Sequence, residues 1–143
     1  MTTGDLAAWL VALSAAILLF LGLVHLLYTF HGRKLHPRDP ALEEAMQRGH
    51  PVLTRRTTMW KAWVGFNASH SMGAILFGLV YGYLAMVQGA LLFASPFLLT
   101  TGLILLLGYT LVGRRYWFRA PNSGIFAATG LYIAGLVVAF VRV

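Results

Sequence analysis

Cysteine is absent from the sequence, which excludes disulfide bonds, thiolate metal sites and thiol redox chemistry. Charge is scarce as well, because charged residues make up 10% of the 143 residues, against roughly a quarter in a soluble domain. The four acidic residues lie outside the long apolar stretches, so those stretches hold no carboxylate. The composition is 59% hydrophobic with a mean hydropathy of +0.74, which predicts an integral membrane protein.

Four apolar stretches predict four membrane-spanning helices. Leu6–Phe30 runs for 25 residues without a charge, enough to cross about 30 Å of hydrocarbon and too long for a cleaved signal, so we expect a retained anchor. Residues 62–113 form 52 positions without a charged side chain, which Gln88–Gly89 divides into two spans. Ser95–Pro96 should open the third helix. A turn over residues 121–124 then precedes a fourth span.

These stretches predict an all-α fold, a transmembrane four-helix bundle. Residues 1–143 should form a single integral membrane domain, with spans at about 6–30, 58–87, 91–116 and 123–142. Lipid would contact the faces of the second span that carry Leu76, Leu79 and Leu84. A small and polar stripe on another face should admit a neighbouring helix closely; its members are Ser71, Ala74, Gly78, Tyr81 and Gly82.

A short helix is predicted in the long loop between the first two spans. Asp39 is a favourable N-cap, Pro40 suits the first helical position, and Arg48 followed by Gly49 is a stop signal. We expect a cytoplasmic interfacial helix that lies on the membrane surface. Its apolar residues should face the membrane or the bundle, and its acids should face solvent or a neighbouring arginine; these are Leu42, Ala45 and Met46, and Glu43 or Glu44.

The basic residues predict one orientation in the membrane. Seven of the eleven lie between the first and second spans, three lie between the third and fourth, and Arg142 alone remains for the other side. Because cytoplasmic loops are enriched in Lys and Arg, both termini are expected in the periplasm and the long loop in the cytoplasm of a bacterial inner (plasma) membrane. The charge of +7 is thus explained by topology, and we expect no nucleic-acid partner.

Polar side chains interrupt the spans at one depth. Asn67 and His70 lie three positions apart on one helical face, and His25 occupies the first span. The helical rise places them roughly 7 to 14 Å from the cytoplasmic edge. We expect these three to form a buried polar site in the cytoplasmic half, with Tyr109 and Thr129 next nearest. Such groups indicate function by default, although a packing hydrogen bond would also explain them.

The string Trp60-Lys-Ala-Trp-Val-Gly-Phe-Asn-Ala-Ser-His-Ser-Met-Gly73 resembles one found in small, uncharacterised four-helix integral membrane proteins of bacteria. The resemblance covers the second span and the loop before it. It implies the fold and the location, and it carries no activity.

Two functions with a reactive or cofactor-binding site remain open. A membrane-embedded enzyme acting on a lipophilic small molecule would use His70 as acid or base, Asn67 to orient either His70 or the substrate, and Tyr109 or Tyr132 as the second catalytic group. A haem or redox protein would use His25 and His70 as axial ligands. A transition-metal site is disfavoured because carboxylate ligands are lacking nearby, and we expect no metal.

An interaction or accessory subunit of a membrane assembly is the interpretation we rank first. The chain holds 15 glycines, and stripes of small residues suit helix–helix contacts in lipid. The expected partners are the lipid bilayer, other membrane subunits or a second copy of the chain. Whether the protein is an enzyme is left open by the sequence.

Overall fold

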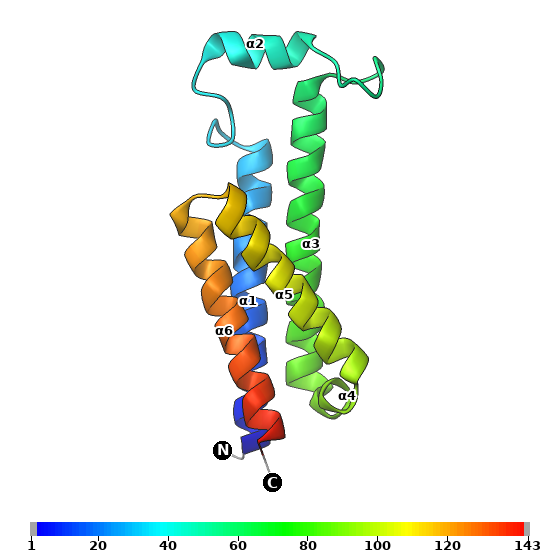
Figure 1. Ribbon diagram of the computed structural model, residues 1–143, viewed down its shortest axis with the longest axis vertical. Coiled ribbons are helices and arrows are strands. Elements are labelled where there is room, and N and C mark those ends of the chain that lie inside the picture. Colours follow the sequence, from blue (N-terminus) through cyan, green and yellow to red (C-terminus); the bar gives the residue numbers. More distant parts are fainter. Residues whose placement is uncertain (1–2, 142–143) are drawn as a thin grey trace. The chain divides into compact units, whose positions relative to one another are not determined.

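The computed structural model describes residues 3–141, and these residues form helices and connecting segments without strands. The six helices in this part of the chain are α1 (Thr3–Phe30), α2 (Pro40–Arg48), α3 (Met59–Val87), α4 (Gly89–Ala94), α5 (Pro96–Tyr116) and α6 (Arg119–Phe140) (Figure 1). Four of the described helices, α1, α3, α5 and α6, are long and apolar enough to cross a membrane. The predicted all-α class is confirmed, and four apolar helices are compatible with a multi-pass membrane protein.

The predicted opening of the third helix at Ser95–Pro96 is confirmed, because Ser95 caps α5 by accepting a hydrogen bond from Leu98 N at 3.3 Å. Two segments differ from those expected. Gly89–Ala94, part of which was assigned to the third span, forms the separate helix α4. Residues 121–124 are helical and belong to the first turns of α6, where a turn was predicted. Pro121 is accepted there because the first N–H groups of a helix have no acceptor within it.

Contacts divide the chain into two compact units. The first combines the chain up to Leu21 with the chain from Ala74 onward, and the second is Gly22–Gly73. Helices α1 and α3 therefore contribute residues to both units. The single-domain organisation stays a prediction.

The first unit has an apolar core drawn from α1, α3, α4, α5 and α6. Its largest fully buried apolar side chains are Val11, Leu18, Leu92, Leu106, Ile125 and Tyr132. Glycine allows the helices to approach: a Cβ added at Gly78 would lie 2.8 Å from the carbonyl oxygen of Ala15. At Gly135 the corresponding distance to the oxygen of Ala7 is 3.1 Å. Close backbone approach is the main source of helix association in lipid, where burial from water gives no driving force.

Three aromatic rings join α3, α5 and α6 within this unit. Phe77 stacks on Tyr81 with 4.6 Å between ring centroids, and Tyr81 meets Tyr132 edge-on at 5.9 Å. The hydroxyls of Tyr81 and Tyr132 donate to the carbonyl oxygens of Leu98 (2.6 Å) and Leu99 (3.1 Å) in α5. Both rings lie against Gly102, where an added Cβ would be 2.7 Å from Tyr81 Cε1. The rings therefore pack because position 102 lacks a side chain.

The faces of α3 are used differently from the prediction in one respect. Leu76 and Leu79 are exposed, as expected for residues that contact lipid, whereas Leu84 is only 9% exposed and belongs to the core. The expectation for Leu84 is wrong because it packs in the cluster that contains Tyr81 and Leu92. Most of the predicted stripe of small residues packs inside the protein, since Ser71, Ala74 and Gly78 are buried.

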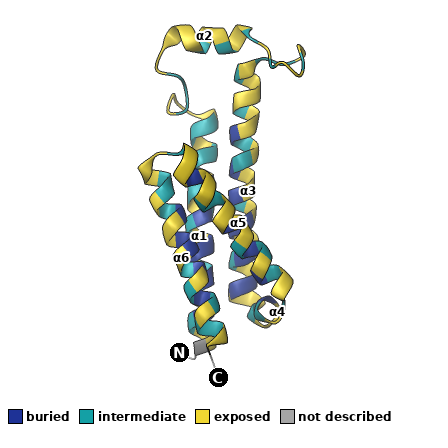
Figure 2. Cartoon of the chain, viewed as in Figure 1, coloured by how far each residue is buried: buried dark blue, intermediate teal, exposed yellow. Residues whose placement is uncertain are grey.

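The second unit contains the end of α1, the helix α2 and the start of α3, with α2 running across the ends of the other two (Figure 1). Helix α2 begins and ends where predicted: Asp39 Oδ1 accepts from Ala41 N at 2.9 Å, Pro40 is the first residue and Gly49 follows the last. None of the residues Pro40–Arg48 is buried (Figure 2). Leu42 is 52% exposed, so its predicted apolar side is available to a membrane surface.

Candidate functional site

The centre of the candidate site is a hydrogen bond between α1 and α3 inside the second unit. His25 Nε2 lies 2.9 Å from Asn67 Oδ1, and Asn67 is 7% exposed. Asn67 Nδ2 donates to the carbonyl oxygen of Trp63 at 2.8 Å, which assigns the acceptor oxygen to the histidine. His25 therefore donates from Nε2, and both groups of the buried amide are satisfied.

His70 joins this pair through its ring. The imidazoles of His25 and His70 meet edge-on with 5.5 Å between centroids, and Phe66 lies nearly parallel to His70 at 6.5 Å. Two hydroxyl groups beside the site donate to the backbone of their own helices. Thr29 donates to the carbonyl oxygen of His25 and Ser71 to that of Asn67, each at 2.8 Å. The structure thus brings together His25, Asn67 and His70, as the sequence predicted.

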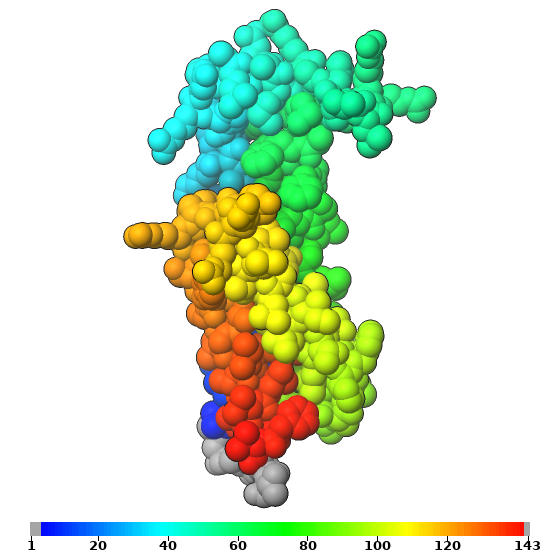
Figure 3. All heavy atoms as spheres, viewed as in Figure 1, coloured from blue at the N-terminus to red at the C-terminus, as the bar shows by residue number. Residues whose placement is uncertain are grey.

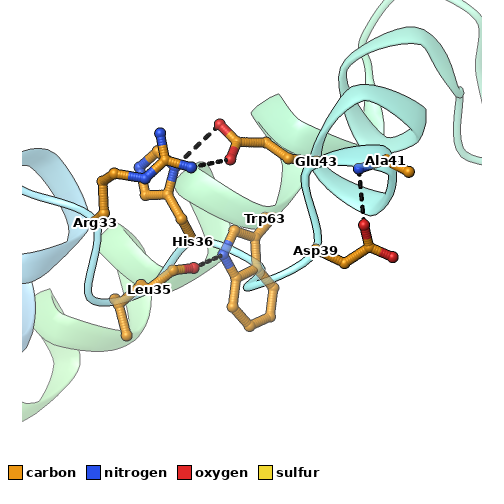
Figure 4. A network of polar contacts seen from close by, with 7 residues as sticks. All are labelled: Arg33, Leu35, His36, Asp39, Ala41, Glu43 and Trp63. Atoms are coloured by element: carbon orange, nitrogen blue, oxygen red, sulfur yellow. Dashed lines mark hydrogen bonds and ion pairs between the residues drawn. The ribbon is translucent and has the colours of Figure 1, made fainter.

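A second polar network in this unit joins α2 to the segment between α1 and α2 and to the start of α3 (Figure 4). Glu43 of α2 accepts from Arg33 at 2.7 Å and pairs with His36 Nδ1 at 3.1 Å. Glu43 therefore has the arginine neighbour that was expected of an acid in α2. Trp63 Nε1 donates to the carbonyl oxygen of Leu35 at 3.1 Å, which ties the start of α3 to the same loop.

A small pocket lies between the network and the buried pair. Its free volume is about 10 Å³, which is about the room that one water molecule needs. Pockets for drug-sized ligands are larger by more than an order of magnitude, at roughly 300 Å³ and above. The lining residues are Thr29, Leu35, His36, Trp60, Trp63, Val64 and Asn67.

Tyr109 and Thr129 belong to the first unit. Tyr109 is half-buried and packs against the apolar core there. Thr129 donates to the carbonyl oxygen of Ile125 at 2.8 Å and shares a hydrogen bond with Thr110 at 2.9 Å. Their expected closeness to His70 stays a prediction, as does the role of Tyr109 as a second catalytic group.

The arrangement does not fit a haem held by both histidines through their Nε2 atoms. His25 Nε2 carries the proton that it donates to Asn67, so its lone pair is not available to iron. Among residues 3–141 no three His, Cys, Asp or Glu side chains are grouped to hold a metal ion.

Sequence reasoning missed an exposed line of small residues on α3. Gly65, Ser69 and Gly73 follow one another at a spacing of four, and all three are exposed. A Cβ added at Gly65 would meet no atom within 4 Å. Phe66 and Met72 border these small residues and are 69% and 63% exposed. The four-residue spacing was visible in the sequence, but which small residues face outward depends on the neighbouring helices.

No protein family, curated protein or solved structure matched the chain in the three comparisons made.

Proposed function

We propose that the chain is an interaction or accessory subunit of a membrane assembly and that α3 associates with another membrane helix through the groove formed by Gly65, Ser69 and Gly73. The observation that carries the proposal is the exposure of these three small residues on one face of an apolar span. A line of small residues gives no packing advantage on a helix surface that contacts only lipid. A second helix, in contrast, can approach the small residues closely and pack against the backbone.

The exposed residues beside the groove support this association. Helical spacing places Phe66 and Met72 on its two sides, and both are exposed, so a partner helix entering over Gly65 and Ser69 would contact two large side chains as well as the backbone. A second copy of the chain is the simplest occupant, because a two-fold axis along the membrane normal would bring two α3 helices together in parallel. Another subunit with a small-residue face would fit in the same way.

The His25–Asn67–His70 cluster then serves as the polar site that fixes the register of α1 and α3. Its buried donors and acceptors satisfy one another, and a satisfied pair costs little to keep and more to break. If the protein were an enzyme, its lipophilic substrate would need space beside Asn67. The pocket beside Asn67 has a volume of only about 10 Å³. The geometry accordingly favours a cluster that positions α1 against α3 over a cluster that catalyses a reaction.

The membrane and the orientation complete the proposal. The positive charge between α1 and α3 supports a bacterial inner membrane with residues 31–58 in the cytoplasm and both termini in the periplasm. In that orientation the polar site lies in the cytoplasmic half.

The proposal is tested by filling the groove. Gly65→Leu adds a side chain into the groove, and Gly108→Leu is a matched control because position 108 also lies in a span, is exposed and has no atom within 4 Å of an added Cβ, but has large exposed residues around it. Association is measured in lipid bilayers by energy transfer between donor-labelled and acceptor-labelled chains, and with labelled candidate subunits. We expect Gly65→Leu to lower the association constant at least tenfold and Gly108→Leu to leave it within twofold. Equal effects of the two variants would remove the basis for the groove.

A further inference from the structure

The segment between α2 and α3 is a closed loop, which we call the 49–59 loop. Its base is joined twice: Met59 N donates to the carbonyl oxygen of Gly49 at 2.9 Å, and His50 Nδ1 donates to the carbonyl oxygen of Thr57 at 2.7 Å. Met59 is the first residue of α3. The base of the loop is therefore fixed at the start of a membrane span.

The tip of the loop is a tight turn with apolar corners. Thr54 N donates to the carbonyl oxygen of Pro51 at 3.2 Å, which places Val52 and Leu53 at the two central positions of the turn. Such positions favour Gly, Asn, Asp, Ser or Pro. Val52 and Leu53 are 109% and 94% exposed, more than any other large hydrophobic side chain in the described residues. The loop therefore holds two apolar side chains away from the protein.

Two arginines follow the tip directly. Arg56 N donates to Thr54 Oγ1 at 3.1 Å, and this local bond shapes the chain after the turn. Arg55 and Arg56 are both exposed, and the salt bridges formed by the described residues involve other side chains. The loop thus combines an apolar tip with two positive charges.

The loop is short enough to stay at the membrane surface. Leu53 is four residues from Gly49, so the tip lies within about 14 Å of Gly49 at the maximum extension of the chain, and Gly49 is hydrogen-bonded to the first residue of α3. The loop between α2 and α3 projects to the side at the start of α3 (Figures 1 and 3). The segment that follows begins with Trp60 and Trp63, residues typical of the membrane interface.

We propose that the 49–59 loop binds anionic lipid: Val52 and Leu53 insert among the acyl chains nearest the headgroups, and Arg55 and Arg56 bind the negatively charged headgroups. Apolar burial and electrostatic attraction act together at such an interface. The charge favours an anionic leaflet over a second copy of the chain, because the three acids of this unit are already engaged: Glu43 and Glu44 pair with Arg33 and Arg48, and Asp39 caps α2.

The experiment uses the absence of cysteine from the native chain. Val52→Cys and Leu53→Cys each receive an environment-sensitive fluorophore, and Gln47→Cys on α2 is the labelled control. Each protein is placed in nanodiscs of phosphatidylcholine alone, or of phosphatidylcholine and phosphatidylglycerol in equal parts. Three measurements together give the ratio of inserted to water-exposed label. They are the blue shift of the fluorophore's emission, its quenching by acrylamide from the water, and its quenching by nitroxide-labelled acyl chains from within the bilayer.

We expect insertion at positions 52 and 53 in the anionic discs, a smaller ratio in phosphatidylcholine, and little insertion at 47. Replacing both Arg55 and Arg56 by glutamine should lower the ratio about thirtyfold, or about fivefold for one arginine. The double variant Arg114→Gln/Arg115→Gln removes the same charge elsewhere and should have an effect below twofold. The proposal is overturned if the labels at positions 52 and 53 stay in water in the anionic discs. It is also overturned if their protection from acrylamide is equal in the two lipid compositions. Protection that appears in detergent, where only contact between chains could cause it, would overturn it as well.

Discussion

The bond between His25 and Asn67 makes a quantitative prediction about stability. Asn67→Leu would remove the acceptor of the half-buried His25 N–H, and an orphaned donor costs about 1–3 kcal/mol when fully buried, so we expect the lower part of this range. His25→Leu would orphan Asn67 Oδ1 in the same way. The double variant removes both partners, so its cost should be less than the sum. Hydrogen-bonded pairs in membranes average about 0.6 kcal/mol and reach about 1.7 kcal/mol, and we expect a coupling energy in this range.

The assay is a double-mutant cycle on reversible unfolding in bilayers or mixed micelles, with the free energy of unfolding measured for the four chains. Ser123→Ala combined with Asn67→Leu is the control cycle, because the Ser123 hydroxyl donates to Arg119 within α6 at 3.0 Å. Independent sites add within about 0.3–0.5 kcal/mol. A coupling between His25 and Asn67 no larger than that of the control would refute the view that the bond fixes the two helices.

Three further predictions follow from other parts of the chain. Gly102→Leu should destabilise the protein by about 1–3 kcal/mol or more, because the new side chain would overlap the ring and hydroxyl of Tyr132, and the unfolding transition measures this. Asp39→Ala should cost α2 about 1 kcal/mol by removing its cap, seen as a more mobile spin label at Gln47 while α3 is unaffected. A topology reporter at Gln47 should read cytoplasmic and one after Val143 periplasmic; the same side for both would contradict four spans.

The sequence was sufficient for the four long helices and α2, and for which side chains of α1 and α3 meet in the polar cluster. Charge-free stretches locate the spans, and the cap at Asp39 and stop at Gly49 bound α2, because these signals act within a few residues of the chain. His25 and Asn67 could be matched by depth, since helical rise is fixed. Their hydrogen bond could not be derived, because the rotation of α1 against α3 decides whether His25 or His70 meets the amide.

The remaining misses have the same cause. Leu84 and Leu79 have similar chemistry and lie on one helix, yet only Leu84 joins the core, because the other helices cover one side of α3. The small residues of α3 likewise split into a buried set with Gly78 and an exposed set with Gly65. Neither the Val52–Leu53 turn nor its closed base carries a standard turn signal, since apolar residues occupy its corners.

The central claim is that α3 associates through Gly65, Ser69 and Gly73, and a cysteine scan of residues 62–76 tests it most directly. Each position is changed singly to cysteine in the naturally cysteine-free chain, labelled there with a photoactivatable cross-linker and irradiated in native membranes, and the mass of each adduct identifies a second copy or another subunit. The account predicts cross-linking that repeats every three to four residues, with maxima at 65, 69 and 73 and minima at the buried positions 67 and 71. Cross-linking without this period, or none at the three small residues, would contradict it.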